Sequence, residues 1–212
     1  MHKSITFQKT YLFRGGKAGE KQSIIAIWHI TESLLEFASL YPQLKKVLNE
    51  LSKQFKSEAH ILEKLAVRAL IETLFPNQNI VLTHTSSGKP QLSNNVNISI
   101  SHTKNFAAII ISEHNNVAID IEYNIKKTKK LGKRFLLKNE TPQTEEEYAI
   151  HWCAKETLFK YFDNKQLFLT NFFITPFKAK ERGKIIGNTT FSDQIISIFY
   201  ENTPHFVLTY II

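Results

Sequence analysis

The amino-acid sequence predicts an α+β fold built from two similar lobes. Helical hydrophobic patterns and runs of short, strand-like segments occur in both halves of the chain, and the turn signal Asn115-Asn116 lies between the halves. No repeat at solenoid spacing and no low-complexity linker interrupts the 212 residues. We therefore expect an N-terminal lobe over residues 1–114 and a C-terminal lobe over residues 115–212.

The first half begins with weakly patterned sequence and continues with helices. Residues 1–30 mix short apolar segments with glycines and predict strands and turns. Apolar residues then recur at helical spacing over residues 31–51, with a break near Pro42. A longer helix is predicted over residues 57–74, because Ser57 is a suitable N-cap and Pro76-Asn77 follows the last apolar residue.

Strand patterns follow these helices. Residues 80–83 lead into a turn at 86–90, and residues 98–101 alternate between apolar and polar, as a half-buried strand does. The continuous apolar run 106–112 predicts a strand buried on both faces, and residues 117–123 predict another strand.

The second half contains one clear helix and several short strands. Thr144 and Glu147 form a capping-box pattern that predicts a helix reaching about Phe162. Residues 168–212 predict short strands separated by turns at two glycines and a proline.

Composition excludes several classes of protein. Hydrophobic residues make up 42% of the chain, and the longest apolar runs, such as residues 107–111, are far too short to cross a bilayer. The N-terminus lacks the pattern of a signal peptide. A single cysteine, Cys153, excludes an internal disulfide framework and a cysteine-rich zinc site. We expect a soluble protein of the cytoplasm, without a membrane partner.

The formal net charge of +8 predicts an acidic partner. Nucleic acid, an anionic membrane, a phosphorylated small molecule or an acidic protein would each satisfy it. Seven basic residues crowd one short stretch: Lys126, Lys127, Lys129, Lys130, Lys133, Arg134 and Lys138. The alternative is that this stretch is simply the solvated face of a surface helix.

Two carboxylates mark one of the predicted strands. Asp120 and Glu122 project from the same face, while Ile119 and Ile121 anchor the other face in the core. Neighbouring carboxylates repel each other unless a cation or a proton intervenes, and oxygen ligands suit a hard ion such as magnesium. The alternative is that this face of the strand is merely exposed to water.

Two further segments carry candidate residues. Trp152, Glu156 and Lys160 share one face of the predicted helix, although Glu156 and Lys160 could equally form a surface ion pair. His102 follows Ser101 at the end of the alternating strand, where a histidine more often caps a strand than binds a ligand. No nucleophile elbow, phosphate-binding loop, dinucleotide fingerprint or zinc-protease motif is present.

Taken together and in order, these segments resemble the 4′-phosphopantetheinyl transferase superfamily, specifically its monomeric, surfactin-synthetase-activating type. The matching motifs are Gly88-Lys89-Pro90, Ile98-Ser99-Ile100-Ser101-His102, Val117-Ala118-Ile119-Asp120-Ile121-Glu122, and Trp152-Cys153-Ala154-Lys155-Glu156 with Lys160. Residues 56–60, 65–68, 133–136 and Glu140 extend the resemblance, which covers roughly residues 30–175.

The resemblance implies a pseudo-dimer of two lobes, each a small antiparallel sheet packed with helices, with the active site in the cleft between them. It also implies an enzyme that transfers 4′-phosphopantetheine from coenzyme A to a serine of an apo acyl or peptidyl carrier protein and releases adenosine 3′,5′-bisphosphate. A monomer is expected, because an internally duplicated fold needs no partner subunit to form its cleft.

The resemblance assigns residues to three roles. Magnesium, or alternatively manganese, would be held by Asp120, Glu122 and Glu156. Lys160 would lie near the pyrophosphate, and the rest of coenzyme A would be bound by Arg68, Lys89, Pro90, Ser101 and His102. Catalysis would depend on Glu156, Lys160 and Asp120, with Glu156 or a metal-bound water accepting the proton of the attacking serine.

The basic stretch then acquires an expected partner, because carrier proteins are acidic. Its docking residues would be Lys127, Lys130, Lys133 and Arg134, with Phe135 as an apolar anchor. Two alternatives remain open. A basic nucleic-acid-binding protein would explain the charge but not the ordered carboxylates, and a catalytically silent homologue would bind coenzyme A or a carrier without turnover.

Overall fold

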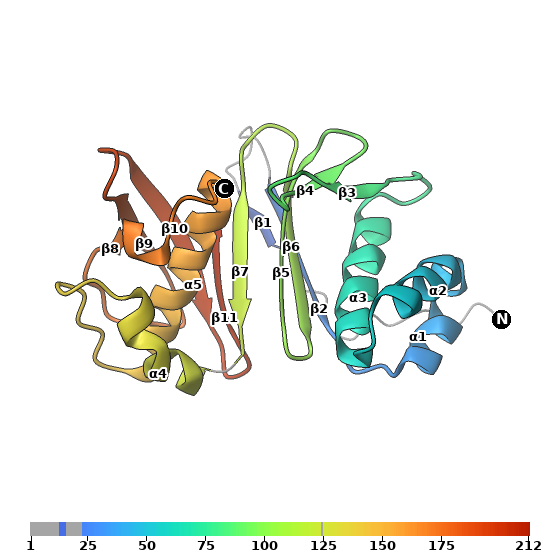
Figure 1. Ribbon diagram of the computed structural model, residues 1–212, viewed down its shortest axis with the longest axis horizontal. Helices are drawn as coiled ribbons and strands as arrows, with labels where there is room; N and C mark the ends of the chain where they lie inside the picture. Colours follow the sequence, from blue (N-terminus) through green and yellow to red (C-terminus); the bar gives the residue numbers. More distant parts are fainter. Residues whose placement is uncertain (1–12, 16–22, 124) are drawn as a thin grey trace.

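The protein is an α+β molecule with antiparallel sheets, as expected. The computed structural model describes residues 13–15, 23–123 and 125–212 (Figure 1). Its first elements are β1 (Phe13–Gly15), β2 (Ser23–His29), α1 (Leu34–Leu40), the 3-10 helix η1 (Pro42–Leu44), α2 (Lys45–Gln54), α3 (Glu58–Leu74), β3 (Leu82–His84), β4 (Pro90–Leu92), β5 (Asn97–Thr103) and β6 (Phe106–Ser112). The remainder are β7 (Ala118–Glu122), α4 (Ile125–Phe135), α5 (Glu145–Phe162), the 3-10 helix η2 (Leu169–Asn171), β8 (Phe172–Ile174), β9 (Arg182–Thr189), β10 (Ile195–Asn202) and β11 (Val207–Ile211).

Two larger sheets organise these elements. The first has the strand order β1-β2-β6-β5 and the second the order β7-β11-β10-β9-β8, while β3 and β4 form a separate hairpin. Every strand pair in the three sheets is antiparallel. Figure 1 shows α1–α3 on one side of the molecule, α4 and α5 on the other, and β5, β6 and β7 between them.

Local signals in the sequence explain where the two long helices begin. The Ser57 side chain accepts a hydrogen bond from the backbone N–H of His60 at the start of α3, and Thr144 does the same for Glu147 at the start of α5. Both predicted helices are therefore confirmed. The predicted strand 106–112 is also confirmed as β6, in which every residue is buried.

Apolar residues form three clusters. One lies between α3 and the first sheet, with Leu65 and Ile109 at its centre, and a second lies between α5 and the second sheet, with Leu158 and Ile198. The third joins the two sheets, because Ile110 of β6 packs in the same cluster as residues of β7 and β11. The division into lobes at residue 115 stays a prediction.

Serine and threonine side chains connect β5 to β7, which belong to different sheets. The contacts are Ile119 N to Ser99 Oγ (3.2 Å), Ile121 N to Ser101 Oγ (3.3 Å), and Thr103 Oγ1 to Glu122 Oε1 (3.1 Å). Alternate residues of a strand share one face, so β5 turns all three hydroxyls toward β7. We call this row of contacts the hydroxyl seam.

Two expectations concern residues that are only partly described. The strands expected over residues 1–30 are represented by β1 and β2, and the rest of that prediction lies outside the described residues. The N-terminal segment, which was expected to lack a signal peptide, lies outside them as well. In the described part of the chain, no helix is both long and apolar enough to span a membrane.

Candidate active site

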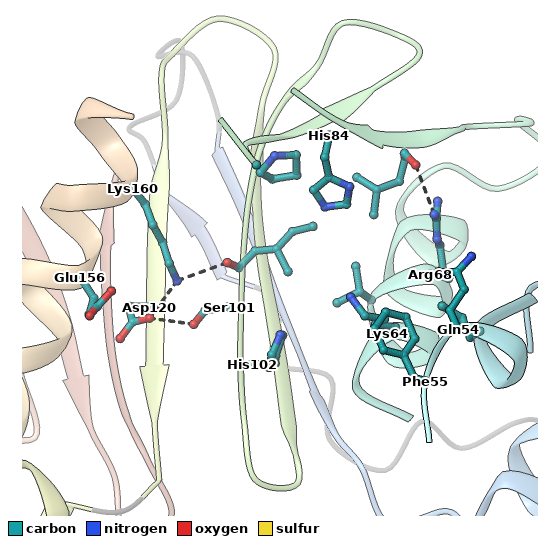
Figure 2. A pocket seen from close by; sticks show the side chains of 16 residues that line it. Gln54, Phe55, Lys64, Arg68, His84, Ser101, His102, Asp120, Glu156 and Lys160 are labelled. Carbon is teal, nitrogen blue, oxygen red and sulfur yellow. Dashed lines mark hydrogen bonds and ion pairs between the residues drawn. The ribbon is translucent and has the colours of Figure 1, made fainter. Parts of the chain in front are cut away.

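A cavity of about 610 Å³ lies where the hydroxyl seam meets α3 and α5. Of the residues predicted to form a site, seven line it: Arg68, Pro90, Ser101, His102, Asp120, Glu156 and Lys160. They come from five different elements and are spread over more than ninety positions of the chain. Figure 2 shows Glu156, Asp120 and Lys160 at one end of this cavity and Arg68 and Lys64 at the other.

Lys160 holds the two strands of the seam together at the cavity. Its Nζ donates to Asp120 Oδ1 (2.8 Å), to the carbonyl oxygen of Ile119 (3.0 Å) and to that of Ile100 (3.3 Å). Asp120 Oδ1 also accepts a hydrogen bond from Ser101 Oγ at 2.8 Å. Both lone pairs of that oxygen are thus engaged, which fixes the Asp120 carboxylate in position. The residue is only 7% exposed, so these hydrogen bonds also compensate for the water that the carboxylate loses.

Glu156 faces Asp120 from α5 (Figure 2). The pKa of Glu156 is raised to about 7, first by burial and then by the negative charge of Asp120, while the positive charge of Lys160 opposes the rise. Near neutral pH, this carboxyl therefore exchanges a proton readily, which is the property of a general base or of a ligand awaiting a cation.

Glu122 and Cys153 lie near Asp120 but do not line the cavity. Glu122 is half-buried, and its Oε1 accepts from Thr103. Burial raises the pKa of the Cys153 thiol well above its usual value, and the charges of Asp120 and Glu122 add to that effect. Cys153 is therefore an unreactive buried thiol.

The predicted metal ligands are not assembled as a ready-made set. In the ranges 13–15, 23–123 and 125–212, no three or more His, Cys, Asp or Glu residues are grouped so that they could hold a metal ion. The ammonium group of Lys160 supplies the positive charge beside Asp120 instead. The donor chemistry nevertheless fits a hard divalent cation, because Asp120 and Glu156 are facing carboxylates whose mutual repulsion such a cation would relieve.

The opposite end of the cavity is cationic. Arg68 Nη2 donates to the carbonyl oxygen of Leu82 (3.2 Å), and burial lowers the pKa of this guanidinium. Lys64 and His84 also line the cavity, although neither was predicted. Burial lowers the pKa of His84, and the charges of Lys64 and Arg68 lower it further. The spacing of Lys64 and Arg68, one helical turn apart, was the available signal for Lys64.

Lys89 lies beside this cavity rather than on it. Its Nζ donates to Asn116 Oδ1 (3.2 Å), and its residue lines a second cavity of about 180 Å³. Gly88, Pro90, Ile100 and Lys160 line both cavities, so the turn before β4 forms part of the wall between them. Gly88 adopts a φ of 91°, which favours glycine at this turn.

One predicted docking residue is buried. Phe135 has no exposed surface and packs edge-on against Trp152, so its prediction as an exposed anchor is wrong. The reason is the amphipathic character of α4, which packs against α5. The carbonyl oxygen of Phe135 accepts from Lys155, whose buried ammonium also pairs with Glu140. The other predicted docking residues are exposed on α4: Lys127, Lys130, Lys133 and Arg134.

A scan against models of known protein families found no match, and a search of curated proteins found none either. No family follows from these comparisons, so any functional conclusion depends on the residues that line the cavity.

Proposed function

We propose that this protein is a 4′-phosphopantetheinyl transferase of the monomeric, surfactin-synthetase-activating type. It would transfer the phosphopantetheine group of coenzyme A to a serine of an apo carrier protein and release adenosine 3′,5′-bisphosphate. The observation that supports this most is one cavity with a carboxylate–lysine cluster of Asp120, Glu156 and Lys160 at one end and cationic Lys64 and Arg68 at the other.

The cavity suits a nucleotide-containing ligand. A volume of about 610 Å³ is within the range of small-molecule sites. Positive groups at both ends match a ligand that carries phosphates at more than one position, and charge-assisted hydrogen bonds to phosphate are strong. The two sheets, each covered by helices, fit the proposed pseudo-dimer.

The carboxylates suit a cation and a proton. Asp120 and Glu156, with Glu122 beside them, would hold magnesium, which when bound neutralises charge on the oxygens of a pyrophosphate. Lys160 brings a further positive charge to the same end of the cavity. Glu156, with a pKa of about 7, is suited to accept the proton of the attacking serine hydroxyl.

The carrier protein would dock beside α4. This helix exposes Lys130, Lys133 and Arg134, and it packs against α5, which carries Glu156 and Lys160. An acidic carrier would therefore be drawn to the same side of the molecule as the carboxylate cluster. Charge of this kind acts mainly on the rate of association.

Mass spectrometry of a carrier protein tests the proposal. The protein is incubated with coenzyme A, magnesium and an apo acyl carrier protein, and the carrier should gain the mass of one phosphopantetheine group. Asp120→Ala should abolish this gain, whereas Asp193→Ala, on the exposed turn before β10, should leave it unchanged. No gain with several carriers, together with salt-dependent binding of DNA, would favour a nucleic-acid-binding protein instead.

A further inference from the structure

Two histidines share one carboxylate oxygen at the edge of the cavity. Glu63 Oε2 lies 3.2 Å from His60 Nδ1 and 3.1 Å from His102 Nδ1. The two rings meet edge-on, with their centroids 5.8 Å apart. His60 and Glu63 belong to α3, whereas His102 belongs to β5 and lines the cavity. This cluster therefore links the helix layer to a residue predicted to bind the ligand.

The position of the shared oxygen determines which ring nitrogen of His102 carries a proton. A carboxylate only accepts hydrogen bonds, so a carboxylate oxygen 3.1 Å from Nδ1 favours the form of the ring that carries its proton on Nδ1. In the described part of the chain, no hydrogen bond involves His102 Nε2. The second ring nitrogen is thus left for a ligand, and the electrostatic contact with Glu63 favours one orientation of the ring.

From this geometry we infer that Glu63 is a positioning residue, which fixes the Nδ1–H form of His102 and so presents Nε2 to the ligand in the cavity. The inference rests on the proposed function, because the ligand concerned is coenzyme A. Glu63 has no role in the resemblance of the sequence to known transferases, and it acts only through His102.

The charged groups around His102 explain why such a partner is needed. Burial lowers the pKa of His102, Glu63 raises it, and His60, Lys64 and Lys160 lower it from α3 and α5. Glu63 is the only one of these four residues that favours the protonated ring. A neutral ring accepts a hydrogen bond at Nε2, whereas a protonated ring donates to a phosphate. The contact of Nδ1 with Glu63 keeps Nε2 available in both states.

Nuclear magnetic resonance of the free protein tests the first part without any ligand. Long-range ¹H–¹⁵N correlation spectra identify the protonated nitrogen of each neutral histidine ring. His102 should carry its proton on Nδ1 in the wild type and show a mixture of both forms in Glu63→Gln. A wild-type His102 protonated on Nε2 would overturn the inference.

Calorimetric titration with coenzyme A tests the second part. Glu63→Gln should bind coenzyme A roughly tenfold more weakly, the lower end of the loss seen when the outer partner of a metal-binding histidine is removed. The matched control is Glu72→Gln, an exposed position of the same helix that bonds to Gln43, and its affinity should equal that of the wild type. In turnover, Glu63→Gln should raise KM for coenzyme A and leave kcat within about twofold.

The two experiments separate the inference from the proposed function. If the wild type does not bind coenzyme A, the proposed function fails. The spectra of the free protein still show whether Glu63 determines the protonated nitrogen of His102. If the wild type binds and Glu63→Gln binds equally well, the positioning role is wrong. Thermal unfolding of both variants, followed by circular dichroism, distinguishes a local effect from loss of the fold.

Discussion

Lys160 makes the most contacts of any charged side chain at the candidate site. Its ammonium group meets one carboxylate and two backbone carbonyls, and these acceptors belong to β5 and β7. Removing it would leave Asp120, which is 7% exposed, without its cationic partner. The side chain therefore serves the packing of the two strands as well as the charge of the cavity.

We expect Lys160→Met to lower kcat for carrier modification by about 100-fold, the scale typical of losing one preorganised charged donor. The methionine preserves most of the volume of the side chain, so the effect is on charge rather than on packing. The control is Lys165→Met, because the Lys165 ammonium is exposed and bonds only to the carbonyl oxygen of Ser86 among the described contacts. Equal rates for both variants would contradict this role.

The pH dependence of the reaction should follow Glu156. Since its pKa is about 7, the fraction of the basic carboxylate increases as the pH rises through 7, and kcat should rise with it. Rates measured between pH 6 and pH 8.5 check this expectation. Glu156→Gln should be slow at every pH and should lack the rise, whereas an unchanged profile in this variant would assign the proton acceptor elsewhere.

The Glu156 carboxyl should also make the free energy of unfolding depend on pH, and this free energy should fall over the same pH range in which kcat rises. Its pKa is raised from 4.5 to about 7, so the folded state binds the proton more tightly than the unfolded state does. The stabilisation is complete below pH 4.5 and is lost as the pH rises through 7. We expect Glu156→Gln to increase the free energy of unfolding at pH 8 by about 3 kcal/mol relative to the wild type, in metal-free urea denaturation.

At the scale of elements, the hydroxyl seam joins the two sheets where the cavity forms. Ser101 both accepts from the backbone N–H of Ile121 and donates to Asp120. Its hydroxyl is therefore occupied within the protein, so its predicted contact with coenzyme A would require one of these bonds to be exchanged.

Ser101→Ala should lower the free energy of unfolding by about 1 to 3 kcal/mol, because it leaves a buried backbone N–H and a buried carboxylate each short of one partner. Ser197→Ala, at a half-buried position of β10 away from the seam, should cost less than about 0.5 kcal/mol. Urea denaturation of both variants gives the comparison. A Ser101→Ala variant as stable as Ser197→Ala would show that the seam contributes little.

Helix α4 should affect one substrate and not the other. Replacing Lys130 and Arg134 by glutamate makes the charge of this exposed face more negative by four units. KM for the carrier should therefore rise about tenfold or more at low salt. The affinity for coenzyme A should stay the same, and the effect should diminish as salt screens the surface. Unchanged carrier kinetics at low salt would exclude α4 as the docking element.

At the scale of the whole molecule, local signals in the sequence predicted the elements well. Ser57 and Thr144 predicted the starts of α3 and α5 because capping depends only on neighbouring residues. The unbroken apolar run of β6 predicted its complete burial. The resemblance to a transferase family, rather than a local signal, grouped Asp120, Glu156 and Lys160, and these three residues line one cavity.

Features that depend on tertiary packing were not predictable in the same way. His84 approaches Lys64 and Arg68 only because the β3–β4 hairpin lies against α3 at the cavity, a contact between distant parts of the chain. Phe135 was expected to be an apolar docking anchor, but it lies on the face of α4 that is buried against the rest of the molecule. The bridging of β5 and β7 by hydroxyls likewise requires both sheets.

The most direct test of the central claim is the stoichiometry of the transfer. The carrier's mass gain and the released adenosine 3′,5′-bisphosphate are measured in one reaction that contains coenzyme A and magnesium. The proposed function predicts one nucleotide released for each phosphopantetheine gained, with neither product formed when the carrier's serine is replaced by alanine. An unmodified carrier and intact coenzyme A, under conditions in which a known transferase modifies the same carrier, would contradict it.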